Sequence, residues 1–262
     1  NTAVGMNSMA ANTTGTQNVA MGTTAGVAIT TGNNNIAIGY LAMDAETTGS
    51  RAVAIGTNAL GSQNGSGTNN YNIGIGYDAG GAVTTGIQNT LIGGLAGDAL
   101  TDADYNVALG YFALTSDTLG SRSTAIGRAA LQDQNFTSAT NAYNVAVGYG
   151  AGEDITTGTE NTLIGSLSGD SLTDADFNVA LGSESLSADT LGSRSVAVGY
   201  SALLTQNFTT ATDSFNVAVG FEAGKATTTG QRNVLVGYQA GLALSTSGNN
   251  TCVGRAAGTS IT

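Results

Sequence analysis

A short alternating phrase recurs along the whole chain: Asn, a β-branched residue, usually Ala or Leu, an aliphatic residue and then Gly. It reads Asn18-Val-Ala-Met-Gly22 near the start and Asn216-Val-Ala-Val-Gly220 near the end. The spacing is 17 residues, and every fourth step is 20 or 21, so four coils repeat every 71 or 72 residues. Such a fixed period predicts a β-solenoid rather than disorder. The 15 closing glycines are Gly5, Gly22, Gly39, Gly56, Gly76, Gly93, Gly110, Gly127, Gly148, Gly165, Gly182, Gly199, Gly220, Gly237 and Gly254.

Positions within a coil are counted from the closing glycine, which is position 0. Position −1 is always aliphatic and position −3 is always Val, Ile or Thr, which predicts a strand. Alternation then places −1 and −3 on one face and −2 and −4 on the other. A second Gly near +10, often after two Thr, completes a predicted coil of strand, Gly turn, second strand and Thr-Thr-Gly turn. We therefore expect one repetitive all-β domain over residues 1–262, a parallel β-roll or β-solenoid of about 15 coils.

Position −4 is Asn in twelve of the fifteen coils, and the exceptions Ala52, Ser123 and Ser195 all fall in the long fourth coil. Strands stacked about 4.8 Å apart bring these amides close enough to bond along the column. The pattern predicts a structural Asn ladder. The additional residues of the fourth coils, such as Gln134-Asn135-Phe136, are expected to form spacer bulges on one edge.

The composition argues against several classes of function. The chain has 39 Gly, only 10% charged residues, one Cys and no Pro, His or Trp. Without His, the usual Ser-His-Asp and Cys-His nucleophile pairs and imidazole metal ligands are excluded, and we do not expect an enzyme. A net charge of −11 disfavours nucleic acid as a partner. Apolar runs are too short for membrane insertion.

Both strand faces lack charge. A single free-standing chain needs only its inner face to be apolar, so the second uncharged face is left without a role. A long aliphatic row exposed to water exceeds what monomers usually tolerate. We expect the chain to assemble with itself as an intertwined homotrimer, although the sequence does not say which strand face forms the interface. The segment is expected to be part of a longer fibre.

The repeated N-x-A-x-G-x-x-A phrase resembles the β-roll repeats in the heads of trimeric autotransporter adhesins. It is also similar to the 17-residue repeats of phage tail fibres that carry an endosialidase-type intramolecular chaperone. The resemblance implies an extracellular structural and adhesive fibre segment, of a virion tail fibre or a bacterial cell surface. The first alternative spaces or presents a host-attachment end, and the second binds a glycan or host protein directly. An ice-binding solenoid is a minor alternative, suggested by the high Thr content.

Arginines and aromatic residues gather in two columns, −5 and +1, just outside the strand. In register, they form triplets in which a guanidinium lies between two rings. This arrangement favours a structural ladder, each contact contributing roughly 0.5–2 kcal/mol; the alternative is a glycan-stacking surface. The candidate residues are Tyr105, Arg122, Tyr143, Phe177, Arg194, Phe215, Tyr111, Arg128 and Tyr149.

Two acidic clusters recur in the same coil of successive four-coil units. Carboxylate oxygens are ligands that Ca²⁺ prefers, but Asp in turns commonly caps backbone amides instead. We favour capping and otherwise expect no cofactor. The calcium candidates are Asp98, Asp102, Asp104, Asp170, Asp174 and Asp176.

Overall fold

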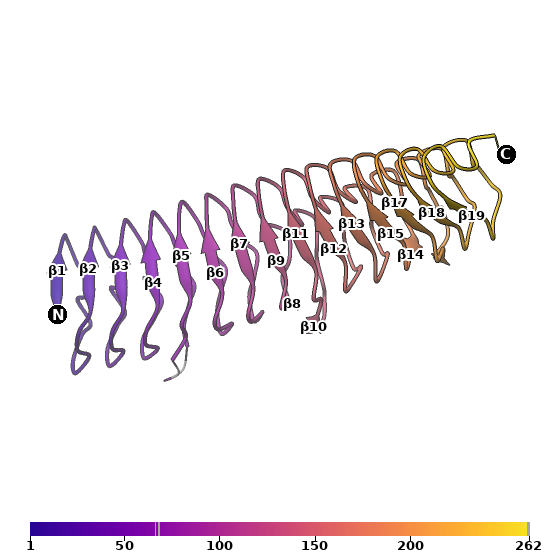
Figure 1. The fold of residues 1–262 in the computed structure, drawn as a ribbon. Coiled ribbons are helices and arrows are strands. Elements are labelled where there is room, and N and C mark those ends of the chain that lie inside the picture. Colours follow the sequence, from indigo (N-terminus) through magenta and orange to yellow (C-terminus); the bar gives the residue numbers. More distant parts are fainter. Residues whose placement is uncertain (66, 68, 261–262) are drawn as a thin grey trace. The chain divides into compact units, whose positions relative to one another are not determined.

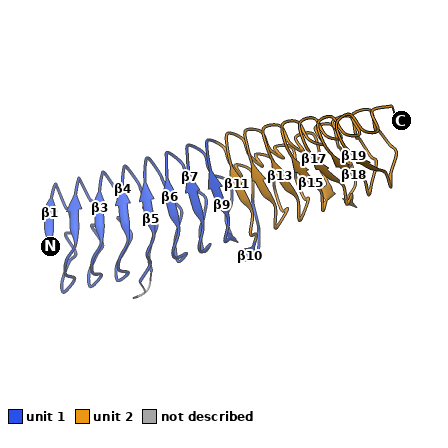
Figure 2. Cartoon of the chain, viewed as in Figure 1, with its two compact units in different colours: residues 1–128, 135–141 blue, residues 129–134, 142–262 orange. Residues whose placement is uncertain are grey.

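The computed structural model describes residues 1–65, 67 and 69–260. It confirms an all-β parallel β-solenoid of about 15 coils, with no helix among the described residues (Figure 1). The chain groups into two compact units, residues 1–128 with 135–141 and residues 129–134 with 142–262 (Figure 2). Both units consist of the same kind of coil. The single-domain expectation stays a prediction.

Unit 1 contains one parallel sheet in which each coil contributes a three-residue strand. Neighbouring strands pair in register one coil apart, so that Ile36 pairs with both Val19 and Val53. The alignment on the closing glycine is therefore also the structural register. Its strands, in order, are β1 (Thr2–Val4), β2 (Val19–Met21), β3 (Ile36–Ile38), β4 (Val53–Ile55), β5 (Ile73–Ile75), β6 (Thr90–Ile92), β7 (Val107–Leu109) and β9 (Thr124–Ile126).

Unit 2 repeats this arrangement. Its sheet strands are β11 (Val145–Val147), β12 (Thr162–Ile164), β13 (Val179–Leu181), β15 (Val196–Val198), β17 (Val217–Val219), β18 (Val234–Val236) and β19 (Thr251–Val253). The long fourth coils add short parallel pairs. In unit 1, β8 (Gly120–Ser121) pairs with β10 (Thr140–Asn141), and in unit 2, β14 (Gly192–Ser193) pairs with β16 (Thr212–Asp213).

The predicted second strand of each coil is wrong, because residues from +1 onward form turns. Alternate residues there have left-handed backbone angles, as in Leu41 (φ 57°) and Met43 (φ 51°). Their N–H groups still bond between coils, from Leu41 to the Thr23 carbonyl (3.3 Å) and from Met43 to the Ala59 carbonyl (3.0 Å). The alternation brings two successive residues, Ala42 and Met43, into the interior. A strand would have placed them on opposite faces.

The strand face that points inward is the one with Ala and Asn. Ala37 and Asn35 are fully buried, whereas Ile36 and Ile38 on the other face remain partly exposed. Interior volume is balanced between positions +4 and +7: coils with Leu or Met at +4 carry a polar residue at +7, and coils with Gly carry a larger apolar residue or Thr. A Cβ on Gly97 would lie 2.8 Å from Leu100. Glycine therefore makes room for the neighbouring side chain.

The Asn column is a ladder, but its amides bond mainly to the backbone. Asn35 Oδ1 accepts from the N–H of Ala52 in the next coil (3.0 Å), and its Nδ2 donates to the Gly49 carbonyl across its own coil (2.9 Å). Each amide thus ties two coils together and closes its own coil. The same pair of bonds is made by Asn1, Asn18, Asn72, Asn89, Asn106, Asn144, Asn161, Asn178, Asn216 and Asn233.

Buried carboxylates anchor the long fourth coils, a feature that the sequence analysis did not predict. Asp189 is fully buried; its Oδ1 accepts from the N–H groups of Gly192 (3.1 Å) and Phe208 (3.0 Å), and its Oδ2 accepts from Gln206 Nε2 (2.5 Å). Phe208 is also buried. The first residues of the extension are therefore packed and hydrogen-bonded to the coil, whereas the residues that follow, such as Thr209 and Thr210, are exposed. Asp117 and Glu46 occupy the equivalent positions in unit 1 and bond to backbone N–H groups in the same way.

Candidate binding surfaces

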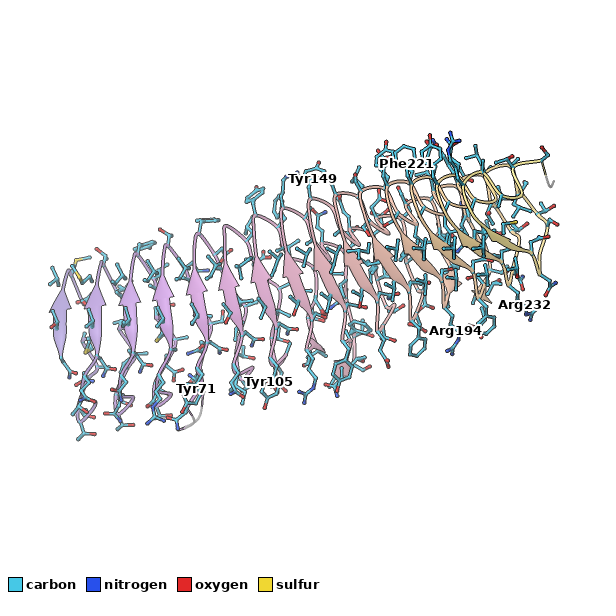
Figure 3. All side chains as sticks on the ribbon, viewed as in Figure 1. Tyr71, Tyr105, Tyr149, Arg194, Phe221 and Arg232 are labelled. Carbon is cyan, nitrogen blue, oxygen red and sulfur yellow. The ribbon has the colours of Figure 1, made fainter. Side chains whose placement is uncertain are left out.

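Three surfaces of the coil present side chains that the interior does not use. They are the outer face of the strands and the two edges at which the strands begin and end. Figure 3 shows Tyr71 and Tyr105 of unit 1 on the edge where strands begin. In unit 2, Arg194 and Arg232 lie on that edge, and Tyr149 and Phe221 lie on the opposite edge.

The outer strand face is a row of aliphatic side chains at positions −1 and −3. In β13, Val179 is 36% exposed and Leu181 is 43% exposed, and the register pairs Leu181 with Ile164 of β12. Val234 of β18 is also exposed. Parallel pairing in register therefore makes these residues a continuous apolar strip, which we call the outer strip, within each sheet.

The −5 edge contains some of the arginine–aromatic contacts that the sequence predicted. The guanidinium of Arg122 lies 4.6 Å from the ring centre of Tyr105, and Arg194 lies 4.6 Å from that of Phe177. Each guanidinium also donates a hydrogen bond from its edge: Arg122 Nε to Asn141 Oδ1 and Arg194 Nε to Asp213 Oδ1, both at 2.9 Å. These contacts satisfy the arginines within the chain and support the structural interpretation of this edge.

Other predicted stacking residues are exposed but differ in their contacts. Phe215 lies on the −5 edge, and no ring contact with Arg194 is found among the described residues. Tyr111 contacts the ring of Phe112, with centroids 4.0 Å apart. The predicted residues therefore lie in the expected columns, but the described contacts place a ring on only one side of Arg122 and of Arg194. The remaining candidates, Tyr143, Arg128 and Tyr149, are also exposed.

In unit 2, three aromatic rings of the +1 edge stack on one another. The sequence predicted the +1 column of aromatic residues but not this stack. Tyr200 and Phe221 have centroids 5.3 Å apart at 22°, and Phe221 and Tyr238 are 5.4 Å apart at 8°. Arg255 continues the stack, 5.7 Å from the Tyr238 ring. The signal that would have found it is the occurrence of rings at +1 in three successive coils.

The acidic candidates mostly cap turns. Thr85 Oγ1 donates to Asp102 (2.6 Å), and the N–H of Ile87 donates to Asp104 (2.7 Å). Asp174 and Asp176 accept equivalent bonds from Thr157 and Thr159 in unit 2. Among the described residues, no group of three or more Asp, Glu, Cys or His side chains is placed to hold a metal ion. The geometry therefore supports capping over calcium binding.

Asp98 and Asp170 belong to a different column, +5, and their pKa values are raised. Burial is the main cause in both, and repulsion from Asp78 adds to the pKa of Asp98 and from Glu184 to that of Asp170. Oδ1 of Asp170 is buried without a hydrogen-bond partner among the described residues. The opposite case is Glu222, whose pKa is lowered by the hydrogen bond from Lys225, Nζ to Oε1 at 2.6 Å.

Comparison with known proteins found no match for this chain among protein-family models, curated proteins or solved structures. In the part of the chain that the structure describes, no helix is long and apolar enough to cross a membrane. Function must therefore be argued from the surfaces themselves.

Proposed function

We propose that this chain is a structural segment of an extracellular fibre, built from three copies that pack through their outer strips. The observation that carries the proposal is that the interior of the coils is packed and hydrogen-bonded, whereas a row of aliphatic side chains on the outside is exposed. Ala, Asn and the apolar side chains of +4 or +7 fill the inside of the coils, with a buried carboxylate such as Asp189 in some of them, while aliphatic residues such as Val179 and Leu181 face outward. A second and third copy would cover the strip with surfaces of the same chemistry.

The work of such a segment is mechanical. Parallel backbone ladders run the length of each sheet, and each Asn side chain adds one bond between coils and one across a coil. Pulling coils apart therefore requires breaking many bonds together. A hydrogen-bonded solenoid of this kind is suited to spacing or presenting an attachment end, and we favour a phage tail fibre over a bacterial surface adhesin. The role requires no catalytic residue.

Light scattering on the purified chain tests the assembly. We expect a mass three times the chain mass of 25.8 kDa. Leu181→Lys, which introduces charge into the outer strip, should reduce the mass towards that of one chain. Thr156→Lys, in an exposed turn, is the matched control and should leave the mass unchanged. A wild-type mass near that of one chain would contradict the proposal.

A second candidate function is adhesion along the length of the segment. It is supported by the exposed tyrosines of the +1 edge, for which the interior of the coil has no use. Binding of cell-surface glycan by the assembled chain, measured on a glycan array, tests this candidate. Absence of binding to any glycan would leave the fibre role without the adhesive one.

A further inference from the structure

Unit 1 carries three tyrosines at position +1 in alternate coils, and we call Tyr40, Tyr77 and Tyr111 the tyrosine row. The residues between them are small, Thr57 and Gly94. Backbone bonds fix this register: the N–H of each +2 residue donates to the +1 carbonyl of the preceding coil, including the carbonyls of Tyr40 (2.9 Å), Thr57 (2.9 Å), Tyr77 (2.9 Å) and Gly94 (3.2 Å). The three tyrosines therefore stand in one line along the edge.

The rings of the row are open to solvent. Tyr40 is 53% exposed, Tyr77 62% and Tyr111 50%. In the same column of unit 2, the stacked rings of Tyr200 and Phe221 cover one another. Among the described residues, neither Tyr40 nor Tyr77 makes a contact with another ring or with an arginine. Their apolar faces are thus available to a ligand.

Glycine at position 94 gives the row its shape. A Cβ at this position would lie 3.3 Å from Cδ2 of Tyr111, so the Tyr111 ring leans over the preceding coil. A larger residue at 94 would displace the ring. The small residues Thr57 and Gly94 thus separate the rings of the row without adding a bulky side chain between them.

The spacing of the row identifies the class of ligand. Two coils correspond to about 10 Å between the backbone positions of neighbouring tyrosines. In an extended β-1,4-linked hexopyranose chain, alternate sugars are flipped, so the same face returns every second sugar, after a similar length. The C–H face of a pyranose packs against an aromatic ring by dispersion and burial of apolar area. An α-1,4-linked chain curls and cannot meet all three rings.

Charge favours a neutral ligand. The chain has a net charge of −11, and a polyanion would be repelled. Polar groups flank the rings of the row. Thr57 is exposed between two of them, and in the adjacent column Asn58 Nδ2 donates to Asp78 Oδ1 at 2.5 Å. A hydroxyl, an amide and a carboxylate beside an aromatic row suit the equatorial hydroxyls of a sugar chain.

We infer that the tyrosine row is a binding platform for a neutral, extended β-1,4-linked polysaccharide, with one ring under every second sugar. The inference rests on the adhesive candidate above and gives it a location and a ligand class. It does not depend on the outer strip or on the number of chains in the fibre.

Isothermal titration calorimetry on the full chain tests the platform with three neutral hexasaccharides. Two are β-1,4-linked, the hexamers of glucose and of N-acetylglucosamine, and the third is α-1,4-linked maltohexaose. We expect at least one β-linked hexamer to bind, and maltohexaose to bind at least about tenfold more weakly. Tyr77→Ala should weaken binding about tenfold, and Tyr77→Phe should restore it, because the ring rather than the hydroxyl supplies the surface.

Two further variants separate the platform from a general loss of folding. Phe221→Ala removes a ring from the unit 2 stack and should leave affinity unchanged. Thr57→Tyr fills the gap between two rings of the row and should weaken binding while preserving the fold. The inference is overturned if neither β-linked hexamer binds, if all three sugars bind equally, or if Phe221→Ala and Tyr77→Ala have the same effect. The light-scattering mass is independent of these outcomes, so failure of the platform and failure of the fibre proposal are distinguishable.

Discussion

The +1 edges of the two units contain the same kinds of residue and use them differently. In unit 1, Tyr40, Tyr77 and Tyr111 occupy alternate coils, and each is at least half exposed. In unit 2, Tyr200, Phe221 and Tyr238 occupy successive coils and stack on one another. The coil backbone is common to both, so the difference follows from spacing alone. The rings of this column stack when they are one coil apart and stay apart from one another when they are two coils apart.

The largest expected effect tests whether the backbone really is common to both units. Gly93→Ala and Gly165→Ala should each destabilise the fold by about 3–5 kcal/mol. Both glycines have a φ near +140°, and an added Cβ would lie about 2.4 Å from a backbone atom of the next coil. Thermal unfolding followed by circular dichroism measures the loss.

The neighbouring Gly94→Ala is the matched control for unit 1, because its Cβ would meet only the side chain of Tyr111. It should cost less than about 1 kcal/mol. A severe loss in one unit and a mild one in the other would show that the two backbones are not equivalent.

The Asn ladder should give the next largest effect, again equally in both units. Asn89→Ala and Asn161→Ala each leave a buried backbone N–H and a buried carbonyl without partners, at a cost of about 2–4 kcal/mol. Urea unfolding measures it, with the exposed Thr156→Ala as control. Loss of less than about 0.5 kcal/mol would mean that the ladder does not hold the coils together.

The aromatic edges themselves should separate the two units. Phe221→Ala removes two ring contacts and should cost about 1–2 kcal/mol. Tyr77→Ala, in the tyrosine row, removes a ring that stacks on no other described ring and should cost about 0.5 kcal/mol or less. Equal losses in thermal unfolding would contradict the distinction between the stacked and the open edge.

The +5 carboxylates should give a smaller effect than the stacked rings of unit 2, and this effect depends on pH. The folded-state pKa of Asp170 is raised above its ordinary value of 3.8, so the folded chain binds this proton more tightly than the unfolded chain. The protonated carboxyl therefore stabilises the fold when the pH is below 3.8, and this stabilisation is lost as the pH rises through the raised pKa of the folded chain. Asp170→Asn should therefore stabilise the fold at pH 7, by about 1 kcal/mol or less, and give no gain at pH 3.

Asp98→Asn should behave in the same way in unit 1, because burial raises the pKa of that carboxyl too. The exposed Asp174→Asn is the control; its carboxylate accepts a bond from Thr157, so it should show no gain at pH 7. Melting temperatures at the two pH values decide. A gain of equal size at pH 3 and pH 7 would show that charge is not the cause.

The sequence predicted the periodic features well because each has a local cause. Closing glycines mark positions where φ is positive and a neighbouring backbone excludes a side chain, and the Asn column marks one bond pattern repeated in each coil. The second half of the coil was mispredicted, because alternating left-handed residues such as Leu41 and Met43 have ordinary side chains and leave no pattern that distinguishes them from a strand. The buried carboxylates were missed for a similar reason, since an acid among turn residues resembles a solvated one.

The sequence by itself determined the coil length, the parallel register, the strand and the two columns of rings, since all of these repeat along the chain. Only the tertiary structure decided which strand face lies inside. Either face could have been buried by its composition, but the interior is already occupied by the apolar side chains of +4 or +7, such as Met43 and Leu100, and the inner strand face meets them with Ala or Leu and a bonded Asn. Packing and hydrogen bonding together decided that Asp189 would lie inside, bonded to the fourth coil, and that the aliphatic strip and the tyrosines would face outward.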